Sequence, residues 1–147
     1  MLLEPLVVLD FETTGLKPHD GDRITEVGLV RIEDGRIVDR YQSLANCDVW
    51  VPHFITSYTG ITQQMVDGAP PVEQVMQEVA AFIGETPVVA HSASFDQRFF
   101  ERECRRQHMS RVIEPFLCSM RLARRVYILE DAMSAVNHSA RASDTQA

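Results

Sequence analysis

Apolar and polar residues alternate in short runs along the first third of the chain, and this pattern predicts three β-strands. Leu6–Glu12 opens with a continuous apolar run, which is typical of a buried strand. Ile24–Ile32 and Ile37–Leu44 alternate, and Glu33–Arg36 between them contains Asp-Gly, which supplies the positive φ of a tight hairpin turn. Leu16–Arg23 is polar and is predicted to be a loop. The three strands therefore form an antiparallel meander.

Helical spacing dominates the middle of the chain. Residues 46–71 are predicted to be mostly irregular, because proline and glycine interrupt them repeatedly, with a short helix after Thr62. From residue 72 to residue 83, apolar side chains recur three and four positions apart, and Gly84 follows them, which predicts a helix with a buried stripe. The stripe consists of Val72, Val75, Met76, Val79, Phe82 and Ile83.

A fourth strand and further helices complete the pattern. Pro87–His91 is short and apolar, and we expect a strand parallel to the first, because a helix lies between the two in sequence. Ser94 is expected to cap a helix over Phe95–Gln107, and another helix is predicted over Phe116–Tyr127. This order of elements predicts an α/β fold with a mixed sheet flanked by helices. A length of 147 residues fits a single domain over residues 1–147.

Composition narrows the class of protein. Apolar residues make up 45% of the chain, and none of its apolar runs reaches the length of a membrane span, so we expect no membrane association. A secretory leader is not evident, and three widely spaced cysteines favour a reduced, cytoplasmic location. The net charge of −7 argues against a general polyanion-binding protein.

The charge is distributed unevenly along the chain. Residues 1–97 hold 5 basic and 15 acidic side chains, whereas residues 98–125 hold eight arginines and three glutamates. An acidic half next to a basic half suits a substrate with a phosphate backbone. The alternative is that the arginines form a solvated helix face balanced by neighbouring glutamates.

Asp10 and Glu12 are the first candidate functional residues. Alternate residues of a strand face the same side, so these two carboxylates lie about 6–7 Å apart along one face. Like charges this close repel each other and lose hydration near a core, and a divalent cation between them makes the arrangement favourable. Oxygen ligands suit Mg²⁺ or Mn²⁺ rather than Zn²⁺. The alternative is an ordinary strand end, where Asp10 caps a turn through Thr13-Thr14-Gly15.

Asp96 is the third candidate, because His91–Asp96 joins the fourth strand to its helix. The carboxyl ends of central strands are the usual ligand sites of such sheets, and the first and fourth strands are expected to be neighbours. Asp96 would then point toward Asp10 and Glu12. Three carboxylates can hold two divalent ions roughly 3.5–4 Å apart, as in-line phosphoryl displacement requires. The alternative is compensation of the helix dipole, which stabilises a helix by about 0.3–1 kcal/mol.

Four segments come in the order and spacing of a known family. They are Asp10–Gly15, Thr59–Thr62 with Met65-Val66 and Ala69-Pro70, His91–Asp96, and Cys118–Ala123. Over about residues 5–127, the chain resembles the DEDD-type 3′→5′ exonucleases with a ribonuclease H-like fold, and in particular the bacterial DNA polymerase III epsilon (proofreading) subunit.

The resemblance implies roles for individual residues. Asp10, Glu12 and Asp96 would bind Mg²⁺ or Mn²⁺ in a two-metal site, and the Thr59–Thr62 loop would support its rim. The residues implied in substrate binding, partly through backbone groups, are Phe11, Thr13, Thr14, Gly15, Ile61 and Phe95. Ser92 stands where the family usually has Asn, which removes a hydrogen-bonding amide but no metal ligand.

The third motif of the family has two alternative alignments in this chain. It consists of a His that acts as general base and, five positions later, an Asp that is the fourth metal ligand. In one alignment, His138 and Asp144 form this motif with one residue inserted, which on a helix rotates Asp144 by about 100° relative to His138. In the other, Asn137-His138-Ser139 matches an earlier family segment, and the sequence stops before the motif. Residues 128–147 are expected to be shortened or atypical in either case.

These observations predict a metal-dependent 3′→5′ exonuclease that releases nucleoside 5′-monophosphates. Its substrate would be a single-stranded DNA or RNA 3′ end, its context proofreading or repair, and its partner a DNA polymerase subunit. One alternative is a catalytically impaired nucleic-acid-binding or polymerase-associated module with the same fold. Another is a hydrolase of small phosphoesters that uses the same metal centre.

Overall fold

One mixed β-sheet organises the part of the chain that is described, residues 4–110 and 114–125 of a computed structural model. Its strands are β1 (Leu6–Thr13), β2 (Ile24–Glu33), β3 (Arg36–Leu44), β4 (Val88–Ala90) and β5 (Leu117–Cys118), in the order β3-β2-β1-β4-β5. The pairs β1·β2 and β2·β3 are antiparallel, and β1·β4 and β4·β5 are parallel. The predicted meander and the predicted parallel fourth strand are therefore confirmed.

The helices lie between the strands along the chain. They are the 3-10 turn η1 (Pro18–Asp20), then α1 (His53–Thr59), α2 (Gln63–Asp67), α3 (Val72–Ile83) and α4 (Ala93–Arg106). Residues 119–125 are also helical. The hairpin turn between β2 and β3 has positive φ at Asp34 and Gly35 (49° and 74°), as predicted from Asp-Gly.

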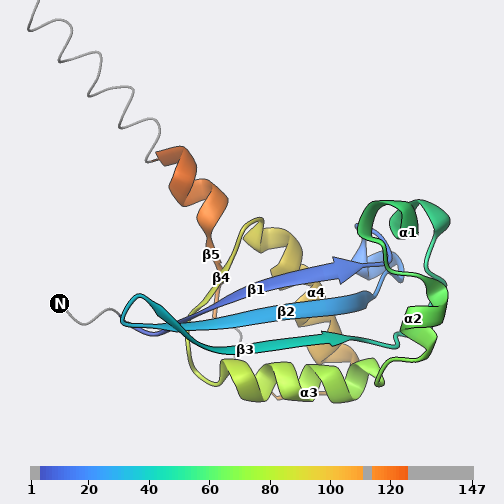
Figure 1. Cartoon of the computed structure of the whole chain (residues 1–147), viewed down its shortest axis with the longest axis horizontal. Helices are drawn as coiled ribbons and strands as arrows, with labels where there is room; N and C mark the ends of the chain where they lie inside the picture. The colour runs from blue at the N-terminus through green and yellow to red at the C-terminus, as the bar shows by residue number, and fades with distance from the viewer. Residues whose placement is uncertain (1–3, 111–113, 126–147) are drawn as a thin grey trace, which may run out of the picture.

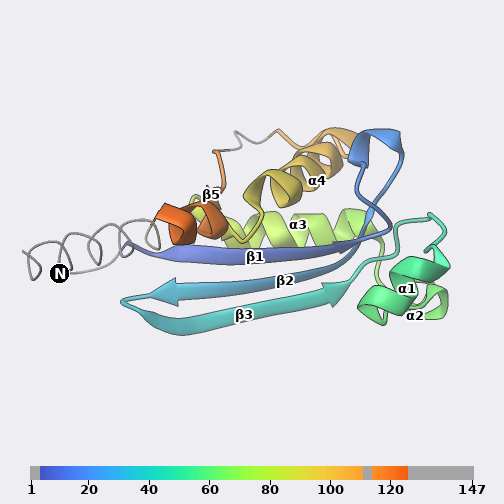
Figure 2. The same cartoon turned by 90° about the horizontal axis from the view of Figure 1, so that it is seen from above.

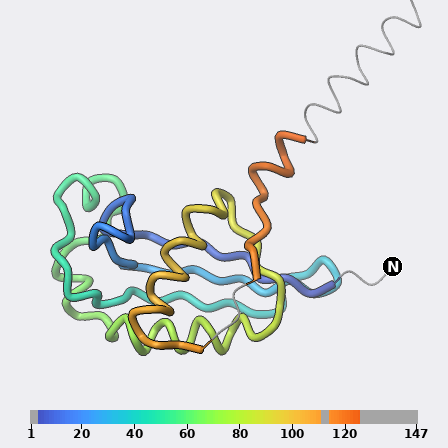
Figure 3. The backbone as a smooth tube through the Cα atoms, turned by 180° about the vertical axis from the view of Figure 1, so that it is seen from behind, coloured from blue at the N-terminus to red at the C-terminus, as the bar shows by residue number. Residues whose placement is uncertain are grey.

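α3 and α4 lie on the same face of the sheet (Figure 2). Seen from behind, α4 crosses in front of the strands, and α3 runs lengthwise along them (Figure 3). The core between these layers joins alternate residues of β1 and β2 to α3 and α4. The α3 stripe is buried as predicted, except that Phe82 is only partly buried. A smaller cluster of Cys47, Val51, Ile61 and Val66 holds α1 and α2 at the end of the sheet.

Three predictions about element ends were wrong. Ser94 does not cap α4, because the helix already begins at Ala93 with Ser92 as its N-cap residue. Residues 46–71 are less irregular than predicted, since they include α1 as well as the expected short helix after Thr62. The segment from Phe116 begins with strand β5 before it turns helical at residue 119. Of these, α1 and β5 have only seven and two residues, which is too short for a periodic apolar pattern to reveal them.

A buried ion-pair network joins α4 to the loop that follows β1. The side chain of Glu103 is 1% exposed and accepts hydrogen bonds from Arg23 Nε at 2.6 Å and Arg106 Nη1 at 2.8 Å. Arg23 also donates to the Cys47 carbonyl, and Arg106 to the Pro18 carbonyl. The cluster of arginines seen in the sequence is therefore partly structural. Among the described helices, none is long and apolar enough to cross a membrane.

We predict that Glu103→Ala lowers the free energy of unfolding by about 3–5 kcal/mol, because it leaves two arginines without their buried counter-charge. Glu101→Ala is the matched control on the same helix. Glu101 is 30% exposed and lies 3.9 Å from Arg105, so its loss should cost less than about 1 kcal/mol. Urea unfolding of both variants measures the difference. Equal costs would show that the network does not stabilise this fold.

Candidate active site

Asp10 and Glu12 lie on the face of β1 that points away from α3 and α4. Val7, Leu9 and Phe11 are buried in the core, whereas Asp10 between them is exposed and Glu12 is half-buried. Strand alternation therefore places both carboxylates on the same face, as predicted. Gly28 of β2 pairs with Asp10 and has open space where a side chain would stand. The surface around Asp10 is thus open to a ligand.

Asp96 joins this face through one hydrogen bond. Strand β4 ends at Ala90, and its ladder with β1 pairs Val7 and Val8 only. The amide of Phe11 therefore lies beyond the ladder, and it donates to Asp96 Oδ1 at 3.1 Å. The bond fixes the first turn of α4 against β1. Its donor, Phe11, is the residue between Asp10 and Glu12. The structure thus brings the two acidic motifs together.

The surroundings of the three carboxylates disfavour their charged forms, first of all by burial. Asp96 is 4% exposed, and burial, together with the charges of Asp10 and Glu12, raises its pKa to about 7 against the opposing Phe11 hydrogen bond. Burial and then Glu26 raise the pKa of Asp10. Burial, Asp10 and Glu26 raise the pKa of Glu12. All three groups are thus destabilised as anions, which a bound cation would reverse.

Two further residues lie beside these carboxylates and were not predicted to be site residues. Glu26 pairs directly with Glu12 across β1 and β2, and like charges in such positions are unfavourable. His91 follows β4, lowers the pKa of Asp10, and lies 3.2 Å from Ser119 Oγ through Nδ1. The strand register decides that Glu26 lies opposite Glu12, and a confident pairing of Leu6–Glu12 with Ile24–Ile32 would have found it.

The donor set suits a hard divalent cation. Asp10, Glu12, Glu26 and Asp96 offer only carboxylate oxygens, which Mg²⁺ and Mn²⁺ prefer, and their mutual repulsion favours a cation among them. As the side chains stand, no group of three or more His, Cys, Asp or Glu among the described residues is arranged to hold a metal ion. The chemistry of these residues therefore fits the predicted cofactor.

Comparison with known proteins identifies the family. The exonuclease family model (RNase_T) matches residues 7–146. The chain belongs to this exonuclease family. The PolC-type DNA polymerase III of Clostridium perfringens is 37% identical over 122 residues, which are 82% of this chain and 8% of that protein. The 3′-5′ exonuclease DinG of Bacillus subtilis is 40% identical over 97 residues, or 66% of this chain and 10% of that protein.

Solved structures agree on the fold. The nuclease domain of 3′hExo, a DEDDh family member bound to rAMP, has a TM-score of 0.62 to this chain at 22% identity, covering 73% of this chain and 61% of that one. The resemblance to DEDD-type 3′→5′ exonucleases of the ribonuclease H-like superfamily is therefore confirmed. The chain spans a tenth or less of the two curated relatives named above.

In this member of the exonuclease family, the Thr13-Thr14-Gly15 turn is held by its own hydrogen bonds. Thr13 Oγ1 donates to the Gly15 carbonyl at 2.6 Å, and Thr14 Oγ1 donates to Asp22 at 3.2 Å. A Cβ on Gly15 would lie 2.3 Å from Asp22 Oδ2, so only glycine fits this close approach. Both threonines are buried. Their contact with substrate stays a prediction. Because both hydroxyls are engaged inside the protein, such a contact would have to come from the backbone of the turn.

The other predicted substrate contacts are buried as side chains. Phe11 is 4% exposed in the main core, and Ile61 is 4% exposed in the small cluster under α1. Phe95 is half-buried and packs on Phe99 with ring centroids 4.9 Å apart. His138 and Asp144 lie outside the described residues.

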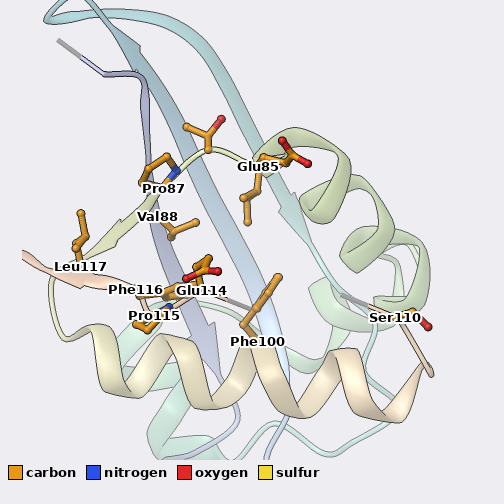
Figure 4. Close-up of a pocket in the computed structure, with 12 residues that line it drawn as sticks. Glu85, Pro87, Val88, Phe100, Ser110, Glu114, Pro115, Phe116 and Leu117 are labelled. Atoms are coloured by element: carbon orange, nitrogen blue, oxygen red, sulfur yellow. The ribbon is translucent and has the colours of Figure 1, made fainter. Parts of the chain in front are cut away.

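A cavity of about 820 Å³ lies at the opposite end of the sheet (Figure 4). Its lining includes Pro87 and Val88 at the start of β4, Leu117 at the start of β5, and Phe100 from α4. Val88 pairs with Val7 in the parallel ladder, so the cavity lies at the amino end of β1 and β4. It is separate from the acidic residues at the carboxyl end of β1.

We predict that Asp96→Asn stabilises the protein in a chelator at pH 8. Asp96 has a pKa of about 7 in the folded state and about 3.9 in the unfolded state. At a pH between these two pKa values, the Asp96 carboxyl is protonated in the folded state and ionised in the unfolded state. The stability that Asp96 contributes therefore falls as pH rises from about 4 to about 7. Asparagine keeps an acceptor for the Phe11 amide and removes the charge.

Thermal unfolding measured from pH 4 to pH 8 tests this prediction. The melting temperature of Asp96→Asn should exceed that of the parent by about 3 °C or more at pH 8, and the gap should close toward pH 4. Asp39→Asn, on exposed β3, is the control and should show no such trend. A parent that gains stability between pH 4 and pH 7 through this residue would contradict the prediction.

Proposed function

We propose that the chain is a metal-dependent 3′→5′ exonuclease that releases nucleoside 5′-monophosphates from the 3′ end of single-stranded DNA or RNA. The observation that carries this proposal is the Phe11–Asp96 hydrogen bond. It joins the Asp10/Glu12 motif of β1 to Asp96 in the first turn of α4. Membership in the exonuclease family supports the reaction type.

The chain's own residues have defined tasks in this reaction. Asp10, Glu12 and Asp96 would hold Mg²⁺ or Mn²⁺, which when bound activates water and stabilises the leaving oxygen of a phosphodiester. Glu26 adds negative charge opposite Glu12 and strengthens the attraction of the site for a cation. The Thr13-Thr14-Gly15 turn presents rigid backbone groups to the terminal nucleotide. The Glu103 network holds the loop that follows this turn.

Two histidines are candidates for the general base. His138 is the residue that the third family motif implies, with Asp144 as a fourth metal ligand. His91 is favoured by position, since it is exposed directly after β4, the strand that pairs with β1. Either would take a proton from the attacking water, a contribution of roughly 10²–10⁴-fold to the rate.

The biological context of the reaction is also a proposal. The relatives named PolC-type are DNA polymerases, which supports action beside a polymerase in proofreading or repair. The absence of a bilayer-spanning helix among the described residues is compatible with the cytoplasmic location expected from the sequence. A nuclease assay with DNA and RNA side by side decides the sugar preference.

We predict that Asp10→Ala abolishes Mn²⁺-dependent release of mononucleotides from a 3′-labelled single-stranded oligonucleotide, because it removes a ligand of the cation. Asp39→Ala is the control: it removes an exposed carboxylate of β3 and should leave the rate unchanged. If the parent protein releases no mononucleotide with Mg²⁺, Mn²⁺ or Co²⁺, the exonuclease proposal fails and the non-catalytic module remains.

We predict that replacing the histidine that acts as general base by alanine lowers kcat, whereas replacing the other candidate histidine does not. His138→Ala should lower kcat by roughly 10²–10⁴-fold if the third motif is formed by His138 and Asp144. The same loss in His91→Ala with an active His138→Ala would instead assign the base to the end of β4. Single-turnover rates as a function of pH distinguish loss of a base, which removes the lower limb of the profile, from weaker substrate binding.

A further inference from the structure

Exposed aromatic side chains gather in one short segment of this protein. Trp50 is 72% exposed, Phe54 68% and Tyr58 89%. Every other Phe or Tyr ring among the described residues is buried or half-buried, so exposed rings of Phe, Tyr and Trp are concentrated within residues 50–58. Scattered apolar side chains on a surface need no explanation, but a cluster of this kind marks a binding surface. We call Trp50, Phe54 and Tyr58 the aromatic patch.

The helix α1 holds the aromatic patch in a fixed place. Ile55 packs α1 onto the cluster of Cys47, Val51, Ile61 and Val66. Phe54 and Tyr58 are exposed to solvent, and because they are four residues apart they lie on successive turns of the same helix face. Four helical residues rise about 6 Å along the axis. Two rings with one base stacked between them are about 7 Å apart, twice the usual stacking distance of roughly 3.4 Å. The spacing of Phe54 and Tyr58 therefore suits a single inserted base.

The position of α1 connects the patch to the acidic site. Both views place α1 beside the arrowhead end of β1 (Figures 1 and 2), which is the end that carries Glu12 and Thr13. Residues 50–59 contain no Asp, Glu, Lys or Arg. An uncharged aromatic surface suits the flat faces of bases, and it neither attracts nor repels the phosphates.

We propose that the aromatic patch stacks on the bases of single-stranded nucleic acid just upstream of the 3′ end that the acidic site holds. This inference rests on the proposed function, because the acidic site supplies the direction of the strand. Stacking on rings is tolerant of sequence, since every base has two flat faces. The patch therefore selects unpaired nucleotides over a duplex, and it adds affinity without reading the base identity.

Binding of a thymidine 12-mer in a chelator at low salt tests the proposal without any catalysis. Trp50 is the only tryptophan of the 147 residues, so its fluorescence reports directly on the patch. The anisotropy of a labelled oligonucleotide gives the affinity. An abasic 12-mer with the same phosphates separates stacking from attraction of the backbone, and a 12-base-pair duplex tests the preference for unpaired bases.

Four variants complete the design. Phe54→Ala and Tyr58→Ala should each raise the Kd for the thymidine 12-mer by roughly 5- to 100-fold. Tyr58→Phe keeps the ring and should bind like the parent. Val38→Ala removes another exposed apolar side chain, 52% exposed on β3, and should also bind like the parent. All three substituted positions are exposed, so circular dichroism should show an unchanged fold.

Saturable quenching of Trp50 by the thymidine 12-mer, lost with the abasic strand and weakened in both alanine variants, would support the proposal. Equal binding of the abasic strand, unchanged affinity in Phe54→Ala and Tyr58→Ala, or no binding at all would overturn it. The outcome is independent of the nuclease assay. If the protein hydrolyses DNA but the binding test fails, only the proposal for the aromatic patch is wrong. If it binds the thymidine 12-mer as expected but hydrolyses nothing, only the exonuclease proposal is wrong.

Discussion

The hydrogen bond from the Phe11 amide to Asp96 is the interaction on which the candidate site depends. It exists because β4 stops at Ala90 while β1 runs on to Thr13, so a backbone donor in the middle of the sheet has no strand partner. A buried donor without an acceptor is costly, and the first turn of α4 supplies the acceptor as a carboxylate. The same geometry therefore satisfies the backbone and brings a third acidic group to Asp10 and Glu12.

The protein stabilises this acidic site at some distance from it. Three carboxylates with raised pKa values oppose folding when they are charged, and the surrounding structure must offset that cost. The core between the sheet and α3 and α4 does so by apolar burial. The Glu103 network does so by tying α4 to the loop after β1. Both lie on the covered face of the sheet, which leaves the opposite face open for a substrate beside Asp10 and Gly28.

The accuracy of prediction followed the length of each element. The eight-residue β1 and the twelve-residue α3 were predicted almost to the residue, since each repeats its apolar period several times. α1 and β5 were missed, because seven and two residues are too few to show a period. Of the site, Asp10, Glu12 and Asp96 were found from their motifs. Glu26 and His91 were missed, because their roles come from strand register and from the place where β4 ends.

The sequence by itself determined the family, the order of the strands along the chain and the acidic residues that the chemistry needs, because these follow from local motifs and local periodicity. Only the tertiary structure decided that Thr13 and Thr14 turn their hydroxyls inward, that Glu26 faces Glu12, and that Trp50, Phe54 and Tyr58 stay exposed beside the end of β1. Burial and contact between distant segments depend on how the sheet and helices pack, and no local pattern of residues contains that information.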